Sequence, residues 1–296
     1  MGRSTKEYDV EFLRPASWRE ALEAKAAHPD ATPIAGGTDV MVELNFDRQR
    51  PEHLLDLTSV PELAEWAPDG DVLRIGAGVP YARIIEELGE RVPGLAMASR
   101  TVGSPQIRNR GTVGGNLGSA SPAGDAHPSL LAAGASVVAE SVRGSRVIPI
   151  DEFFAGPKRH VLDPDELIAA IRIAPAAGPQ QFSKVGTRNA MVIAVCTFAI
   201  SLDPASRTVG TGIGSAAPTP VRAREAEDFL ATELDWDAAL EDSAARRFGE
   251  LVAQASSPID DVRGSAQYRQ HALAVLARRT LSWAWHEHRS GRQECA

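Results

Sequence analysis

Two glycine-rich segments, far apart in the chain, have the composition of a phosphate-binding surface. Each joins a glycine pair to small hydroxyl or amide side chains, and apolar residues border both. Glycine lets the backbone adopt positive φ and approach a ligand closely, so that successive N–H groups converge on an anion. Either segment alone is equally well explained as an ordinary turn, but the two together predict one dinucleotide site. The predicted binding residues are Pro33, Ile34, Ala35, Gly36, Gly37, Thr38, Asp39 and Val40, with Thr112, Val113, Gly114, Gly115 and Asn116.

The second glycine-rich segment belongs to a longer polar run, residues 104–125, which we expect to be a non-helical loop. Loops of this length are usually functional when they are ordered. Asp125, at the end of the run, is a candidate acceptor for a sugar hydroxyl or a ring N–H. It is also placed to cap a helix that starts at Ala126. Asp39 is expected to cap a short helix, because a carboxylate beside a diphosphate would be repelled.

The Rossmann and P-loop fingerprints do not describe this chain. The nearest approach to the Rossmann pattern is Gly-Thr-Gly-Ile-Gly-Ser at 210–215, where serine occupies the third glycine position. This segment reads better as a strand paired with 191–202, so we interpret its glycines as features of a sheet. Two arginines near the second glycine-rich segment, Arg108 and Arg110, suit phosphate neutralisation and carboxylate pairing equally well.

The composition excludes several classes of function. The chain has 296 residues and a net charge of −8, which argues against a nucleic-acid surface or a polybasic membrane contact. No apolar stretch approaches the length of a membrane span. Its two cysteines, Cys196 and Cys295, cannot hold an iron–sulfur cluster that needs four thiolates, and they give no disulfide framework. We therefore expect a cytoplasmic protein, with Cys196 in the core.

Periodicity and turn residues predict an α+β protein with a change of pattern near residue 175. The Pro/Gly/Ala-rich stretch 174–179 is a predicted linker. Helices are expected over 17–27, 40–45, 81–88, 95–99, 223–230, 235–254 and 263–288, and a short helix or turn over 165–170. Strands are expected over 31–35, 53–57, 72–75, 135–140, 146–149, 170–173, 182–185, 191–202 and 208–215. The strands followed by helices after the linker suggest a separate lobe.

Several motifs resemble the FAD-binding subunits of molybdenum hydroxylases, the family of xanthine dehydrogenase and aerobic carbon monoxide dehydrogenase. They are Ala-Gly-Gly-Thr-Asp at 35–39, Ser-Pro-Gln-Ile-Arg-Asn-Arg-Gly-Thr-Val-Gly-Gly-Asn-Leu at 104–117, and Ala-Ser-Pro-Ala-Gly-Asp at 120–125. The resemblance implies a two-lobed flavin domain of the vanillyl-alcohol-oxidase (PCMH) type over 1–175, with lobes of about 1–60 and 61–175. It also implies a C-terminal α+β domain of the CO dehydrogenase flavoprotein type over 180–290, built from a three-stranded antiparallel sheet and helices.

By position, the resemblance implies that both glycine-rich segments hold FAD, with single contacts from Asp125, Ile168 and Lys184. A lysine near the flavin would stabilise its reduced, anionic form, whereas the structural alternative for Lys184 is a solvated lysine at a strand edge. Ile168 would pack on the cofactor or in the core. No residue is predicted to act as a catalytic acid, base or nucleophile, or as a metal ligand.

The resemblance also implies partners. Electrons from a substrate oxidised at the molybdenum cofactor of a large subunit would pass through the [2Fe–2S] clusters of a small subunit to this FAD, and then to NAD or another acceptor. The wording of the motifs is most similar to bacterial xanthine dehydrogenases and carbon monoxide dehydrogenases, in which the flavin subunit is a separate chain. The alternative is a flavin oxidoreductase that acts on its own substrate without molybdenum partners.

Overall fold

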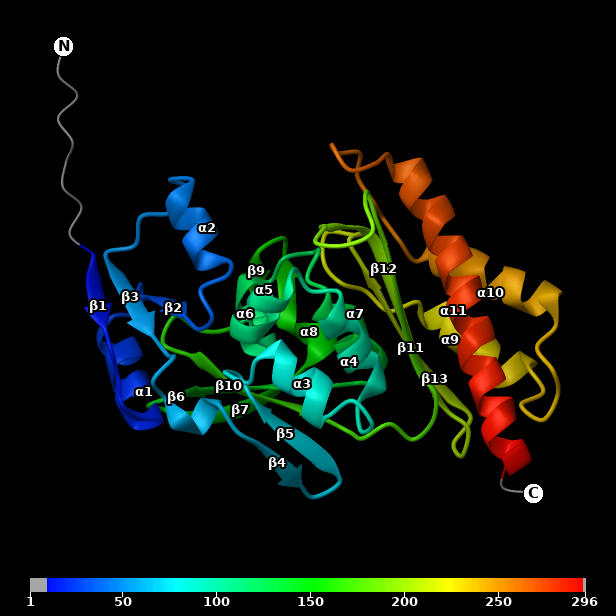
Figure 1. Ribbon diagram of the computed structural model, residues 1–296, viewed down its shortest axis with the longest axis horizontal. Helices are drawn as coiled ribbons and strands as arrows, with labels where there is room; N and C mark the ends of the chain where they lie inside the picture. Colours follow the sequence, from blue (N-terminus) through cyan, green and yellow to red (C-terminus); the bar gives the residue numbers. More distant parts are fainter. Residues whose placement is uncertain (1–9, 295–296) are drawn as a thin grey trace, which may run out of the picture.

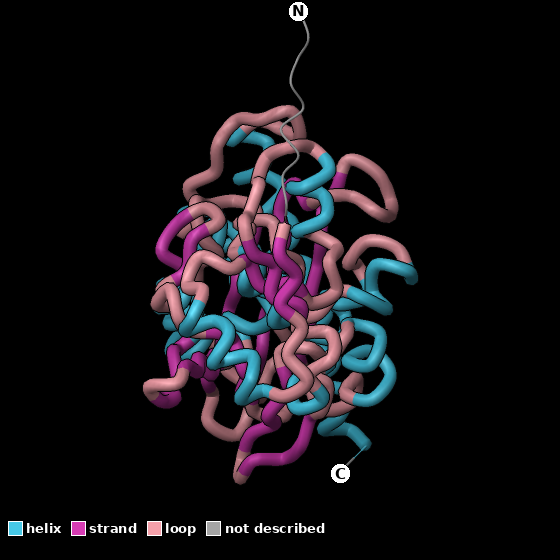
Figure 2. Tube along the Cα trace, turned by 90° about the vertical axis from the view of Figure 1, so that its left-hand side faces the viewer, coloured by secondary structure: helices cyan, strands magenta, loops and turns pink. Residues whose placement is uncertain are grey.

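The computed structural model describes residues 10–294 and contains three main β-sheets along the long axis of the molecule (Figure 1). Buried apolar side chains form two large clusters. One is drawn from residues between 21 and 173, around the first two sheets, and the other from residues between 196 and 285, around the third. Figure 2 looks at the end of the molecule that carries β1 (Glu11–Leu13) and shows helices and loops around the strands. The chain has the α+β architecture that its sequence predicts.

A small parallel sheet leads into the first glycine-rich segment. Its strands lie in the order β1-β3-β2, and β3 is therefore the central strand. Gly37, with φ of 74°, turns the chain out of this sheet in a conformation that favours glycine. Asp39 precedes the next helix, but its carboxylate makes no cap hydrogen bond, so the capping role predicted for it is wrong. The elements are α1 (Trp18–Ala27), β2 (Thr32–Ile34), α2 (Val40–Asn45) and β3 (His53–Asp56).

The second sheet is antiparallel and has β10 at its centre. Its strands, in spatial order, are β4 (Trp66–Asp69), β5 (Val72–Gly76), β10 (Leu167–Ile173), β6 (Ser136–Ser141) and β7 (Gly144–Pro149). The short helix or turn predicted over 165–170 is wrong, because β10 already begins at Leu167. Residues 167–171 are all buried, and a run buried on both faces lacks the alternation that identifies a strand.

Short helices cover the second sheet and carry the second glycine-rich segment. They are η1 (Pro61–Leu63), α3 (Tyr81–Glu87), α4 (Pro93–Arg100), α5 (Pro105–Arg110), α6 (Val113–Ser119), α7 (Ala126–Ala132) and α8 (Ile150–Phe153), followed by a two-stranded ladder of β8 (Phe154–Gly156) and β9 (Arg159–His160). The non-helical loop predicted over 104–125 is wrong, since it contains α5 and α6. Side-chain caps start both helices: the hydroxyls of Ser104 and Thr112 accept hydrogen bonds from the N–H groups of Ile107 and Gly115.

The third sheet is a three-stranded antiparallel meander with helices on both sides. Its strands are β11 (Gln180–Gly186), β12 (Ala194–Asp203) and β13 (Thr208–Gly214). A Cβ at Gly210 or Gly212 would overlap the carbonyl oxygen of Ala132 or Pro128 in α7. The alternating glycines therefore let α7 pack closely on one face of β13, which confirms that they belong to a sheet and not to a nucleotide-binding turn.

Three helices complete the second core: α9 (Arg224–Glu233), α10 (Asp242–Gln254) and α11 (Ala266–Glu294). The predicted helix start at 235 is wrong, because Trp236 is buried in a loop and donates its indole N–H to the Leu230 carbonyl. Cys196 is buried in β12, as predicted, whereas Cys295 lies outside the described residues. Over residues 10–294, no helix has both the length and the apolar character needed to cross a bilayer.

Candidate functional site

A cavity of about 820 Å³ collects most of the residues predicted to bind a cofactor. Helices α2, α5 and α6, the strand β9 and the start of β10 contribute to its walls. The predicted residues that line it are Pro33, Ala35, Gly36, Gly37, Thr38, Asp39, Val40, Thr112, Gly114, Gly115, Asn116, Asp125 and Ile168. Ile34, Val113 and Lys184 are not in the lining. This volume is within the range that suits a small-molecule or cofactor site.

The first glycine-rich segment is in direct contact with Arg110 and Gly111, the two residues that precede the second segment. A Cβ at Gly36 would overlap the carbonyl group of Arg110, so only glycine permits this approach. The second segment is fixed in turn to the start of α3, because the Tyr81 N–H donates to the Gly111 carbonyl at 3.0 Å and Pro80 bridges to Thr112. The predicted pairing of the two segments around one space is thus present in the structure.

The adjacent glycines of α6 have different surroundings. A Cβ at Gly114 would lie 2.5 Å from both the Cβ and the carbonyl oxygen of Ala77, so this glycine is required for packing. A Cβ at Gly115 would meet only the Thr112 hydroxyl, at 3.2 Å, and would otherwise enter open space. Both residues line the cavity. Gly115 therefore keeps the cavity open without being needed for the packing of the protein itself.

Three buried oxygen atoms at this cavity lack a hydrogen-bond partner: the Tyr81 hydroxyl, Asn116 Oδ1 and Asp125 Oδ1. Buried polar atoms are normally paired, and an unpaired one is costly. Burial, with a smaller contribution from Asp125 and Asp39, raises the pKa of Tyr81 well above its usual range. The phenol is therefore a neutral donor, and the two carbonyl-type oxygens are acceptors. This set fits a ligand with hydroxyl, imide and carbonyl groups, as the flavin expected from the sequence has.

Asp125 and Lys184 form a buried ion pair beside the cavity. The Lys184 ammonium donates to Asp125 Oδ2 at 2.7 Å and to the Thr101 carbonyl at 3.3 Å. The two side chains are only 12% and 9% exposed, so Lys184 is not the solvated strand-edge residue of the structural alternative. Burial raises the pKa of Asp125, and Lys184 opposes that rise. Asp125 makes no side-chain cap bond to α7, so its predicted capping role is wrong.

The remaining wall of the cavity comes from Ile168, which the sequence predicts, and from residues that the sequence does not single out. Ile168 faces α6, where a Cβ at Gly118 would lie 3.9 Å from its Cδ1 atom. Further lining residues are Tyr81, Ala77, Gly78, Lys158, His160, Leu162 and Leu167. None carries a recognisable motif, because each reaches the cavity through long-range packing. Only the Gly76-Ala77-Gly78 sequence after a strand offers a local signal.

The two arginines beside the second glycine-rich segment have different environments. Arg108 donates through Nη1 to the carbonyls of Val102 and Gly103 at 3.1 and 3.2 Å, so it stabilises the preceding turn. It pairs with neither of the two partners considered from the sequence, a phosphate or a carboxylate. Arg110 lines the cavity and remains available to an anionic ligand.

His127, next to the Asp125 segment, gives the fold a dependence on pH. It is fully buried, contacts Asn116 O through Nε2 at 3.2 Å and packs against Phe154. Burial lowers its pKa from 6.5 to about 4. The unfolded chain therefore binds a proton more readily than the folded chain, and stability is lost as the pH falls from 6.5 to 4. At about 1.4 kcal/mol per pKa unit, the complete loss is about 3 kcal/mol.

We expect the urea midpoint of the protein to fall between pH 7 and pH 4.5, and a His127→Gln variant to show a shallower fall. The matched control is His271→Gln on the exposed side of α11, which should keep the wild-type pH slope. An unchanged slope in His127→Gln would mean that the pKa of His127 is the same in the folded and the unfolded chain.

Comparison with known proteins identifies a family over most of the chain. Residues 7–176 match the family model of the FAD binding domain in molybdopterin dehydrogenase, and residues 181–284 match that of the CO dehydrogenase flavoprotein C-terminal domain. The xanthine dehydrogenase FAD-binding subunit of Escherichia coli O157:H7 is 31% identical, over 92% of this chain and 95% of that protein. The nicotine 6-hydroxylase medium subunit of Paenarthrobacter nicotinovorans is also 31% identical, over 92% of this chain and 96% of its own length.

Solved structures show the same fold. A chain of carbon monoxide dehydrogenase from Hydrogenophaga pseudoflava superposes with a TM-score of 0.87 at 28% identity, covering 94% of this chain and 98% of its own. Quinoline 2-oxidoreductase from Pseudomonas putida 86 gives 0.87 at 26% identity, covering 95% and 98%. The cavity and its unpaired oxygens agree with these matches. The chain belongs to the family of FAD-binding medium subunits of molybdenum hydroxylases.

Proposed function

We propose that this chain is the FAD-carrying electron-transfer subunit of a xanthine dehydrogenase-like molybdenum hydroxylase. It accepts electrons from the [2Fe–2S] clusters of a small partner subunit, which receives them from a large subunit with the molybdenum cofactor, and passes them to NAD or another acceptor. The observation that carries the proposal is the cavity lined by both glycine-rich segments and by unpaired buried oxygens. The full-length match to FAD subunits supports the partners.

FAD, when bound, supplies the exchange between hydride transfer and single-electron transfer that such a subunit needs. The chain's own residues hold it. The two glycine-rich segments provide a surface without side chains, and Arg110 provides positive charge for the diphosphate. Tyr81 donates, and Asn116 and Asp125 accept, at polar groups of the cofactor. Lys184 acts through Asp125, whose carboxylate it holds in place at 2.7 Å.

We further propose that residues 1–175 form the flavin domain, in lobes of about 1–60 and 61–175, and that 180–290 form the C-terminal domain. The separate apolar clusters before residue 174 and after residue 195 support this division. A cytoplasmic location is proposed as well. It is supported by the buried free thiol of Cys196, since thiols stay reduced in the cytoplasm, and by NAD, the expected electron acceptor, which is a cytoplasmic cofactor.

The first experiment measures the chromophore of the purified chain by absorbance, heat release and mass. One FAD per chain is expected, and a colourless chain that takes up no added FAD would refute the cofactor site. The second is purification from the native host, followed by assay of the complex for iron, molybdenum and NADH formation. A chain that turns over a substrate alone, without these metals, would favour the stand-alone oxidoreductase.

Gly118→Ala is expected to stabilise the protein and weaken its hold on FAD. Alanine is favoured over glycine in a helix by about 1 kcal/mol, and the new methyl group would be in ordinary contact with Ile168. The same methyl group narrows the cavity, so we expect FAD to bind roughly tenfold more weakly, the effect of about 1.4 kcal/mol of crowding. The measurements are the melting temperature of the apoprotein and the dissociation constant of FAD.

Gly291→Ala in α11 is the matched control, because a Cβ there meets nothing within 4 Å. It should also favour the helix but should leave FAD affinity unchanged. Equal FAD affinity in Gly118→Ala and Gly291→Ala would place the cofactor away from this part of α6.

A further inference from the structure

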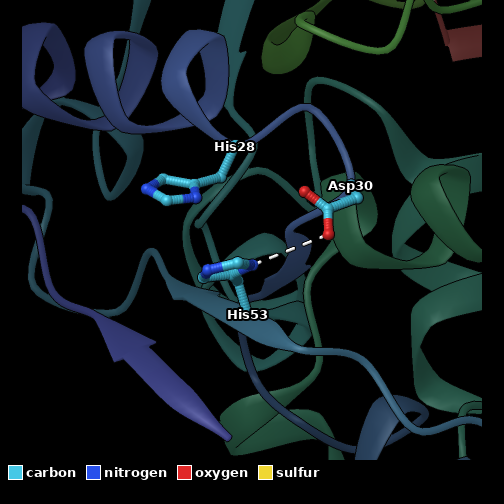
Figure 3. A group of neighbouring side chains, drawn as sticks. All are labelled: His28, Asp30 and His53. Atoms are coloured by element: carbon cyan, nitrogen blue, oxygen red, sulfur yellow. Dashed lines mark ion pairs between the residues drawn. The ribbon is translucent and has the colours of Figure 1, made fainter.

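Three side chains with metal-binding atoms converge at the end of the first sheet where β3 begins, outside the cavity. His28, Asp30 and His53 each present one such atom within 4.8 Å of the other two. Figure 3 shows the two imidazole rings facing one another, with the Asp30 carboxylate directed toward His53. The ring centroids of the histidines lie 4.2 Å apart, and His53 Nδ1 is 3.6 Å from Asp30 Oδ2. None of the three residues lines the cofactor cavity.

The backbone holds these residues in place independently of any ligand. His28 ends α1, and its carbonyl accepts from the Ala31 N–H at 2.9 Å, which closes a tight turn around Asp30. The buried Lys25 ammonium fastens the same turn by donating to the carbonyls of Pro29 and Ala31, at 2.8 and 2.7 Å. His53 begins β3, the central strand of the sheet. Little backbone conformational entropy is therefore left to lose when the three side chains bind one ion.

One ring nitrogen of His53 lacks a hydrogen-bond partner. Its Nδ1 atom is buried and has no hydrogen-bond partner, since 3.6 Å from Asp30 Oδ2 is too long for one. In a tetrahedral zinc site, two ligand atoms lie about 3.3 Å apart. The 3.6 Å between His53 Nδ1 and Asp30 Oδ2 is close to this value, so both atoms could bind one ion. The other ring nitrogen, Nε2, lies 3.6 Å from Glu11 Oε2, where a carboxylate would orient the ring.

We propose that His28, Asp30 and His53 bind a divalent transition-metal ion such as Zn²⁺. Two imidazoles and one carboxylate select borderline ions over Mg²⁺ or Ca²⁺, which prefer oxygen ligands throughout. Three protein ligands leave at least one coordination position for water, and the exposed Asp30 places that position at the surface. The ion joins the turn after α1 to β3 and so stabilises the first sheet. The alternative is an ion pair of His53 with Asp30 and Glu11, without a metal ion.

Calorimetric titration of the full chain with Zn²⁺ tests the proposal. The titration uses a Cys295→Ser background, so that this thiol takes no part. We expect one ion per chain, and we expect His53→Gln to weaken binding at least about 100-fold, the upper end of the loss caused by an outer ligand partner. Asp30→Asn, an isosteric change at an exposed position, should also weaken binding and serves if His53→Gln disturbs the sheet.

His271→Gln, at an exposed position on α11, is the matched control and should titrate like the parent chain. Zn²⁺ should raise the melting temperature of the parent and of this control, but not that of His53→Gln or Asp30→Asn. No binding by the parent chain, or the same affinity in Asp30→Asn and His53→Gln as in the parent, would overturn the site and leave the ion pair. FAD content is measured on the same samples and should not change, so this test is independent of the proposed function.

Discussion

A Gly115→Val chain is expected to fold and to bind no FAD. A Cβ at this position meets only the Thr112 hydroxyl, so the protein itself tolerates a side chain there with a small adjustment. The two γ-methyl groups of valine would extend into the cavity, where the protein backbone is expected to approach the cofactor most closely. Crowding a tightly packed site typically costs about 1–3 kcal/mol, and it costs more where the ligand cannot move aside, as in a cavity lined by both glycine-rich segments. FAD content after purification and after incubation with excess FAD is the measurement.

The neighbouring glycine provides the matched control. Gly114→Ala places a methyl group 2.5 Å from the Cβ and the carbonyl oxygen of Ala77, so it should destabilise the fold by roughly 1–3 kcal/mol through overpacking. Gly115→Val should have a urea midpoint near that of the wild-type apoprotein, whereas Gly114→Ala should have a lower one. Stoichiometric FAD in Gly115→Val would refute the assignment of this segment to the cofactor.

The parts of the fold predicted best from the sequence are those specified by local patterns. The β6–β7 hairpin follows from Gly144 between two apolar runs, and α1 follows from Ser17 with Glu20 three residues later. Serine in place of a required glycine, together with a strand-like neighbouring run, predicts that the glycines of β13 belong to a sheet. The structure adds the reason that a sequence does not contain, the close packing of α7 on that strand.

The helices missed in the run 104–125 show where local reasoning fails. α5 and α6 have six and seven residues, and α6 contains three glycines, so their intrinsic helix propensity is low. Packing against Ala77 holds α6 in place, and the end of α5 packs against Gly36 of the first glycine-rich segment. The sequence does contain helix-start signals. Ser104 is an N-cap residue followed by proline, and the Thr112 hydroxyl caps α6 by accepting from the Gly115 N–H.

The candidate site was predictable only where a motif carries it. FAD and the family are confirmed by the comparisons, and both rested on the glycine-rich motifs. Tyr81 has no motif, and its buried hydroxyl becomes notable only when its lack of a partner is seen. No local pattern links Asp125 to Lys184, because their pairing across 59 positions depends on how β11 packs against α4 and how α4 packs against α7. Such a contact is a property of the tertiary fold.

Lys184→Met is expected to be the most destabilising single substitution at the site. It removes one partner of an ion pair whose side chains are only 9% and 12% exposed, and leaves the Asp125 carboxylate buried without a countercharge. Losing one partner of a buried pair typically costs about 3–5 kcal/mol. Burial already raises the pKa of Asp125, and removing Lys184 raises it further. Because a protonated Asp125 is neutral, the deficit relative to wild type should shrink as the pH is lowered from 8 to 5.

The double variant Lys184→Met/Asp125→Asn separates the charge from the packing. It should recover most of the stability lost in Lys184→Met and should remove the pH dependence of the deficit, because no buried charge remains. Arg19→Met, in the exposed pair with Glu23, is the matched surface control and should leave the urea midpoint unchanged. FAD affinity is measured in the double variant: weaker binding supports contact between Asp125 and the cofactor, because the fold is then intact. Unchanged binding would restrict the pair to joining β11 to the segment before α7.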